Sequence, residues 1–363
     1  MTDQHRTTNE INRRLHQILE TESISASAPC RIDMGGTLDI SSFYYPLSHI
    51  NPCTFNISMS LRTRVRISAF QKGWIKISSK GFESAKYPLD QVPFRHPMGL
   101  IFAVAAYFQM DGIHIQIESA SPPRSALGGS SVAAVALIAA YNQLLEKLGR
   151  PVIPLGRIAL LAHGIEESVA GVPCGLQDQL AAVYGGVNAW FWKGAGSALP
   201  YVRQPLSGSG ICANLSGHLL VAYCGMPHES KNINGIWVNR FIAGETRNYW
   251  TDIVQCTRAF VEAFSNSDVS AAVAQLNRET EIRVDMTPDV LDETGTQLIH
   301  AARDHLCGAR FTGAGGGGCV WAFGEMDGIA KLKPAWEKIL AKTPTAGLLN
   351  MTMDAEGLRP ETH

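Results

Sequence analysis

The chain has 363 residues, of which 45% are hydrophobic and 17% are charged, and its formal net charge is -1. This composition is typical of a globular protein long enough to form two domains, each with its own core. The near-neutral charge, without a basic stripe, argues against a nucleic-acid partner. No apolar run approaches the length of a membrane span, so we expect no membrane partner.

Two features of the sequence indicate a cytoplasmic protein. The first residues are polar, and no apolar stretch follows that could serve as a signal peptide. The eight cysteines are scattered without a Cys-x-x-Cys pair, which argues against a zinc site or a disulfide framework. We therefore expect buried thiols in a reducing compartment.

The first half of the chain is predicted to combine strands with helices. Ile11, Leu15, Ile18 and Leu19 fall at helical spacing and predict a short amphipathic helix within residues 1–22. Between residues 54 and 79 apolar and polar residues alternate, which indicates half-buried antiparallel strands. Strands are predicted over residues 24–34, 54–68, 74–79, 112–118, 186–193 and 200–205, and helices over residues 98–110, 131–147, 155–170 and 176–184.

A glycine- and serine-rich break at residues 207–210 is the predicted domain boundary. It separates an N-terminal extension (1–23) and a first domain (24–206) from a second domain (211–363). The second domain is predicted to hold strands 218–224, 309–312, 319–323 and 347–353, and helices 231–247, 250–265, 267–283, 288–304 and 327–342. Because strands and helices mix without regular βαβ alternation, the predicted fold class is α+β rather than doubly wound.

The segment Pro122–Ala134 has the layout of an anion site at the start of a helix. Its small residues let backbone N–H groups approach a phosphate, and the helix dipole adds partial positive charge there. A plain loop before a buried helix, with Ser130 or Ser131 as an ordinary cap, explains this segment equally well by itself. The predicted nucleotide-binding residues in this loop are Pro123, Ser125, Ala126, Leu127, Gly128, Gly129, Ser130 and Ser131.

Three further segments, 28–39, 171–186 and 311–320, are rich in glycine and stand in a set order with this loop. Together the four resemble the motifs of the GHMP small-molecule kinases, a superfamily that includes galactokinase, homoserine kinase and mevalonate kinase. The resemblance implies ATP and Mg²⁺ as cofactors and a monomer or homodimer. It also implies a ribosomal-protein-like N-terminal domain, a ferredoxin-like C-terminal domain and an active site between them.

The resemblance also assigns roles to individual residues. Asp178 matches the catalytic aspartate, and Arg31 matches an arginine that could pair with it and stabilise charge on the γ-phosphate. Ser131 and Glu166 match the magnesium ligands, and Gly315, Gly316 and Gly317 belong to the turn behind the phosphates. Taken alone, Asp178 could be a helix cap, Glu166 part of a solvated helix face and the glycine run a bare hairpin turn.

The acceptor is predicted to be a sugar or sugar phosphate. The runs Gln177–Gln179 and Gly185–Gly186, with the turn Gly35–Thr37, resemble the heptose 7-phosphate kinase branch most closely. Galactose, fucose or mevalonate as acceptor, or a non-catalytic sensor of ATP and sugar, stay open. A phosphorylated acceptor would need cations, for which His228, Lys231, Arg62 and Arg283 are candidates. The predicted substrate-binding residues are Gly35, Gly36, Thr37, Asp39, Asp178 and Gly186.

Overall fold

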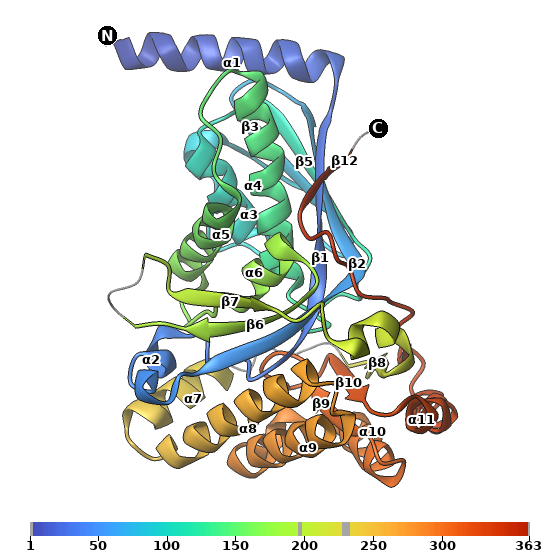
Figure 1. The fold of residues 1–363 in the computed structure, drawn as a ribbon. Coiled ribbons are helices and arrows are strands. Elements are labelled where there is room, and N and C mark those ends of the chain that lie inside the picture. The colour runs from blue at the N-terminus through green and yellow to red at the C-terminus, as the bar shows by residue number, and fades with distance from the viewer. Residues whose placement is uncertain (1–2, 195–197, 227–232, 362–363) are drawn as a thin grey trace.

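The computed structural model of the protein describes residues 3–194, 198–226 and 233–361, with side chains from residue 10 onward. Two sheets, each covered by helices, form two layers of the molecule, with β1 and β2 running the length of the first (Figure 1). The predicted α+β class is confirmed. No helix among the described residues is long and apolar enough to cross a membrane.

The first sheet has eight strands in the order β12-β1-β2-β5-β3-β4, and β6 and β7 extend it beside β2. All pairs are antiparallel except β3 with β5. Its strands are β1 (Ile24–Met34), β2 (Cys53–Ala69), β3 (Trp74–Ser79), β4 (Ala85–Pro88), β5 (Ile113–Ser119), β6 (Val187–Trp192), β7 (Tyr201–Pro205) and β12 (Arg359–Glu361). Its helices are α1 (Asp3–Thr21), α2 (Ser41–Tyr44), α3 (Gly99–Phe108), α4 (Gly129–Lys147), α5 (Leu155–Ala170) and α6 (Gln177–Tyr184), with short 3-10 turns at Ser48–Ile50 and Leu89–Gln91.

Strand β2 shows why the two domains pack as they do. Its second half alternates as predicted, with Val65 and Ile67 buried and Arg64 and Arg66 exposed. Its first half is buried on both faces, because helix α8 of the second domain covers it. Phe55, for example, contacts Phe260 of α8 at a ring-centroid distance of 4.9 Å. One strand therefore belongs to the core of the first domain and to the junction with the second.

The second sheet is antiparallel, in the order β11-β8-β10-β9, and packs against the helices of the second domain. The helix predicted over residues 288–304 is interrupted, because the Asp292 side chain caps a new helix by accepting from the Gly295 N–H at 2.6 Å. The strands are β8 (Leu219–Tyr223), β9 (Gly308–Phe311), β10 (Cys319–Phe323) and β11 (Gly347–Leu348). The helices are α7 (Ile233–Ile242), α8 (Arg247–Ser265), α9 (Val269–Met286), α10 (Glu293–Asp304) and α11 (Met326–Leu340), with 3-10 turns at Gly210–Gly217 and Pro288–Val290.

The C-terminal segment returns to the first sheet. The strand predicted over residues 347–353 is only β11, and Met353 forms an isolated bridge with Met59 of β2. Beyond it, β12 pairs with β1, so the end of the range assigned to the second domain lies beside the first (Figure 1). Arg62 fastens this segment by an ion pair to Asp354 and a hydrogen bond to the Gly357 carbonyl.

Helix α4 provides the firm base under the predicted anion loop. Twelve of its residues are buried, among them Val132, Leu137 and Tyr141, since it packs against β1, β2, α3, α5 and α6. A helix buried nearly all round holds its ends in place by its packing. The N-terminus of α4, after Gly128, is therefore fixed where the two domains meet.

Candidate active site

A cavity of about 1030 Å³ lies where the two domains meet, and segments from both line it. The first domain contributes the loop after β1, residues 119–131 and the start of α6. The second contributes Tyr223, Asn234, Gly313 and Ala314. The motifs at residues 28–39, 122–134 and 171–186 thus place side chains on this cavity. The motif at residues 311–320 contributes Gly313 and Ala314.

The anion loop forms one wall of the cavity. Of its eight predicted nucleotide-binding residues, seven line the cavity and Leu127 is buried behind them. The backbone of Arg124, Ala126 and Gly128 is left-handed, with φ of 53°, 60° and 81°. At Gly128 a side chain would also crowd Asp178, since a Cβ would lie 3.0 Å from its Oδ2. The loop is therefore bent sharply and brought against the predicted catalytic aspartate.

Arg31 and Asp178 form the ion pair that the sequence predicted. Arg31 Nε donates to Asp178 Oδ1 at 2.8 Å, and Nη1 donates to the Ala126 carbonyl of the anion loop at 2.7 Å. Burial works to lower the pKa of Arg31, but the charges of Asp178 and Asp33 outweigh burial and raise the pKa. One guanidinium thus fixes the carboxylate and the loop relative to each other.

A buried network of charges stands behind Arg31. Asp33 forms an ion pair with Arg31 at 3.4 Å, and it accepts from Arg310 at 3.3 Å and from the Gly313 N–H at 2.8 Å. Glu279 of α9 pairs with Arg310 at 2.7 Å and with Arg283 at 2.9 Å, and all three side chains are fully buried. Burial works to raise the pKa of Glu279, but the two arginines lower it.

Sequence reasoning gave no role to Asp33, Glu279 or Arg310. A signal existed for one of them, because Arg310 stands inside the apolar run of β9 and a charge in a buried strand needs a partner. Arg283 was proposed to bind a phosphorylated acceptor. Instead it is buried, donates to the Gly36 carbonyl at 2.6 Å and stacks on Trp237 and Trp250.

The two predicted magnesium ligands lie together at the cavity. Ser131 Oγ donates to Glu166 Oε2 at 2.8 Å, and Gln179 Nε2 donates to the same oxygen at 2.6 Å. Burial raises the pKa of Glu166 to about 7, against the hydrogen bond from Ser131. A hydroxyl and a carboxylate beside an anion loop are oxygen donors that suit Mg²⁺. Within the described ranges no group of three or more acidic, histidine or cysteine side chains could hold a metal.

Asp39 and Gln177 meet at the wall of the cavity. Asp39 Oδ2 accepts from the Gln177 backbone N–H at 2.9 Å, so Asp39 caps α6 from a distant part of the chain. A side chain at Gly175 would collide with the Asp39 carboxylate, which explains the glycine. Burial raises the pKa of Asp39 to about 6, the hydrogen bond from Gln177 opposes this, and the charge of Asp178 adds to it.

Several predicted residues do not line the cavity. Gly35 packs against Thr257, and the Gly36 carbonyl binds Arg283. Gly186 lies at the start of β6 and donates to the Asp354 carbonyl at 2.6 Å. In the glycine turn, Gly315 lies against the Val290 carbonyl, and Gly316 donates to it at 2.9 Å.

The end of the glycine turn supports the anion loop. A Cβ at Gly318 would lie 2.7 Å from the Ser125 carbonyl, and Thr312 Oγ1 also approaches that carbonyl, at 3.5 Å. The cavity lining includes none of the three predicted glycines, Gly315, Gly316 and Gly317. Of the other proposed phosphate-binding cations, Arg62 holds the C-terminal segment, and His228 and Lys231 lie outside the described residues.

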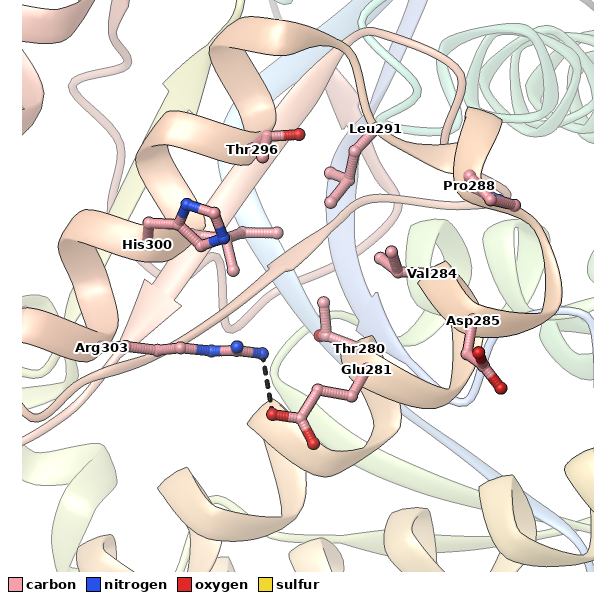
Figure 2. Close-up of a pocket in the computed structure, with 10 residues that line it drawn as sticks. Thr280, Glu281, Val284, Asp285, Pro288, Leu291, Thr296, His300 and Arg303 are labelled. Atoms are coloured by element: carbon pink, nitrogen blue, oxygen red, sulfur yellow. Dashed lines mark ion pairs between the residues drawn. The ribbon is translucent and has the colours of Figure 1, made fainter.

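A second, smaller cavity of about 300 Å³ opens between α9 and α10 in the second domain. Figure 2 shows Arg303 of α10 pointing toward Glu281 of α9, an ion pair of 3.1 Å. His300 and Thr296 lie on the same side of α10. None of the residues predicted from the motifs lies here, and no glycine loop borders it.

Known proteins resemble the chain in sequence and in fold. Residues 97–186 match the family described as GHMP kinases N terminal domain. A mevalonate kinase of Thermococcus sibiricus is 24% identical over 295 residues, which cover 73% of this chain and 80% of that one. A D-glycero-alpha-D-manno-heptose 7-phosphate kinase of Campylobacter jejuni is 25% identical over 205 residues, 56% of this chain and 58% of that one.

The fold of the whole chain also has solved counterparts. A D-glycero-D-manno-heptose 1-phosphate kinase from Bacteriodes thetaiotaomicron superposes with a TM-score of 0.70 at 17% identity, covering 94% of this chain and 99% of that one. This likeness extends well beyond the matched segment and includes the second domain. The resemblance inferred from the four motifs is confirmed for residues 97–186, which match the GHMP kinase N-terminal domain, and the chain shares the fold of the heptose 1-phosphate kinase.

Proposed function

We propose that the protein is an ATP-dependent kinase that transfers the γ-phosphate of ATP to a hydroxyl of a sugar or sugar phosphate. The observation that carries this proposal is the ion pair of Arg31 with Asp178, which lies in the same cavity as the anion loop and the Ser131–Glu166 pair. Phosphoryl transfer requires a loop that binds the phosphates, side chains that bind the metal ion and a base for the acceptor hydroxyl. The anion loop, the Ser131–Glu166 pair and Asp178 would supply these. In keeping with the sequence, we also propose a cytoplasmic monomer or homodimer.

The cavity, at about 1030 Å³, has room for ATP. The anion loop and the N-terminus of α4 would bind its phosphates. Next to this loop the lining is apolar, with Pro97, Met98, Ile101 and Ile117, and this end would take the adenine base. Ser131 and Glu166 would hold Mg²⁺, which neutralises charge on the phosphates when bound.

Asp178 would accept the proton of the acceptor hydroxyl. Its carboxylate is 21% exposed, so a substrate can reach it, while Arg31 occupies Oδ1 and leaves Oδ2 for the hydroxyl. Arg31 holds Asp178 in place and would stabilise charge that builds on the transferred phosphoryl group.

Mevalonate is the second candidate acceptor, because the curated relative that covers most of this chain is named a mevalonate kinase. The sugar assignment is supported by the polar wall around Asp39, Gln177 and Asn234, since several short polar groups suit several hydroxyls of one ring. Gly35 and Gly36, which we predicted to contact the sugar, lie behind this wall and do not support the assignment.

The test is ADP release by the pure protein with ATP, Mg²⁺ and one acceptor at a time. We expect turnover with D-galactose, L-fucose or D-glycero-D-manno-heptose 7-phosphate, and none with mevalonate or homoserine. Turnover of mevalonate alone would refute the sugar acceptor and leave the kinase in place. ATP binding without turnover of any acceptor would point to the sensor instead.

A further inference from the structure

The side chain of Gln177 is buried at the cavity with half of its amide unused. It is only 4% exposed, yet it lines the cavity beside Asp178. Its Oε1 has no hydrogen-bond partner among the described residues. An unpaired buried carbonyl oxygen is costly, and native proteins rarely keep one without a reason. A donor that arrives with the acceptor substrate would remove this cost.

The groups around Gln177 are also acceptors of hydrogen bonds. The Gln177 backbone N–H already serves Asp39, whose carboxylate is 4% exposed. Asp178 follows Gln177 in the first turn of α6. Arg31, which also lines the cavity, is engaged with Asp178 and Asp33. The wall is therefore built to receive O–H groups and to repel a carboxylate.

The second domain contributes Asn234 to the cavity lining, next to Thr37 of the first domain. Thr37 Oγ1 lies 3.4 Å from Oδ1 of Asn234, in the first turn of α7, and both residues line the cavity. Thr37 has φ of 78°, a left-handed backbone that a β-branched residue rarely adopts. Strain of this kind is kept where the surroundings hold a side chain in a required place.

We propose that Gln177, together with Asp39, Thr37 and Asn234, forms a subsite that binds a second, non-reacting hydroxyl of the acceptor while Asp178 serves the reacting one. This inference rests on the proposed kinase function and deepens it. It makes the acceptor a polyol with at least two neighbouring hydroxyl groups. It also makes Gln177 the residue that selects such an acceptor over one bearing a carboxylate.

The experiment compares wild type with Gln177→Met, which keeps the volume of the side chain and removes the amide. The probes are D-galactose, D-mannose and D-glycero-D-manno-heptose 7-phosphate, then monodeoxy forms of the best of them, with mevalonate and homoserine as carboxylate acceptors. We expect Gln177→Met to lower kcat/KM for the polyol by roughly 10- to 100-fold. The KM for ATP should stay within about twofold, because Gln177 lies away from the anion loop.

The deoxy analogues separate recognition from a structural role. For the analogue that lacks the hydroxyl bound by Gln177, wild type and Gln177→Met should have equal kcat/KM. The matched control is Gln143→Met, another glutamine of the first domain, whose amide donates to the Ser25 carbonyl away from the cavity. It should leave kcat/KM unchanged on every acceptor.

Three results would overturn the subsite alone, and a fourth would overturn it together with the proposed function. Gln177→Met could turn over the polyol with the kcat/KM of wild type. It could also lose the same factor in kcat/KM on every deoxy analogue, which is the behaviour of a residue that only supports the fold. Turnover of mevalonate with no polyol active would reject the subsite while the kinase stands. ATP binding with no ADP release from any acceptor would instead reject the proposed function, and the subsite with it.

Discussion

Asp178 is the residue on which the proposed chemistry depends most directly. We expect Asp178→Asn to lower kcat by roughly 100-fold or more, because the amide cannot take up the proton of the acceptor. Binding of ATP should stay near normal, since Asn can still accept from Arg31 Nε through Oδ1. Steady-state kinetics and ATP titration measure the two effects. A variant with the wild-type rate would remove Asp178 from the proposed chemistry.

Glu166 and its neighbour Glu167 form a natural pair for testing the metal site. Ser131→Ala and Glu166→Ala should each raise the Mg²⁺ concentration at half-maximal rate, since each loses one oxygen donor at the phosphates. The control is Glu167→Ala, because the Glu167 side chain is 52% exposed and does not line the cavity. Equal midpoints for Glu166→Ala and Glu167→Ala would remove Glu166 from the metal site.

At neutral pH the buried charge of Asp39 should make the wild-type protein less stable than a variant with a neutral side chain at this position. The pKa of Asp39 in the folded protein is raised to about 6 from an ordinary value of 3.8. The cost of burying its charge is therefore fully present above about pH 6 and disappears as the pH falls toward 4. Asp39→Asn can still accept from the Gln177 N–H, so it should gain about 1–3 kcal/mol at pH 8.

Urea unfolding of wild type and Asp39→Asn at pH 8 and at pH 4 checks this expectation. The other titrating groups are the same in both proteins, so the difference between them isolates Asp39. The gain should shrink to near zero at pH 4. A gain that is the same at both pH values, or a less stable variant at pH 8, would contradict the charge-burial argument.

At the scale of elements, local patterns predicted most helices and strands because their causes are local. The alternation in β2 predicts which face of the strand is buried, and the apolar run of α4 predicts a buried helix. The interruption before α10 was missed, although Pro288 and the cap Asp292 both carry a signal for it. Strand β12 could not be found from sequence, because it has only three residues, two of them exposed and one a proline.

The candidate site divides in the same way. Arg31, Ser131, Glu166 and Asp178 were predicted because each stands in a recognisable motif, and the structure brings all four to one cavity. The network behind them was not predicted, because Glu279 and Arg310 meet only after α9 and β9 pack together. Contact of Gly35 and Gly36 with the substrate stays a prediction, and the sequence does not show that Arg283 binds the Gly36 carbonyl.

At the scale of the whole molecule, the buried charges join the two domains. Glu279 compensates two buried arginines, and Arg310 in turn reaches Asp33 of the first domain. Glu279→Gln would leave these cations short of a counter-charge, and we expect it to lower the free energy of unfolding by about 3–5 kcal/mol.

Urea unfolding measures this loss, and Glu281→Gln on the same helix is the matched control. Glu281 is 47% exposed and pairs with Arg303 at 3.1 Å, so its loss should cost below about 1 kcal/mol. Similar losses for both variants would show that the buried network contributes no more than a surface ion pair.

The pairing of β12 with β1 also constrains how the protein is made. Ser27 of β1 and Glu361 of β12 form a hydrogen bond across 334 residues of sequence. A ribosome releases the partner of β1 only after the entire second domain has been translated. Until then the edge of β1 that pairs with β12 stays unpaired, so the first domain exposes a strand edge. Because contacts so distant in the chain close slowly, the seam between β1 and β12 should be among the last parts of the molecule to form.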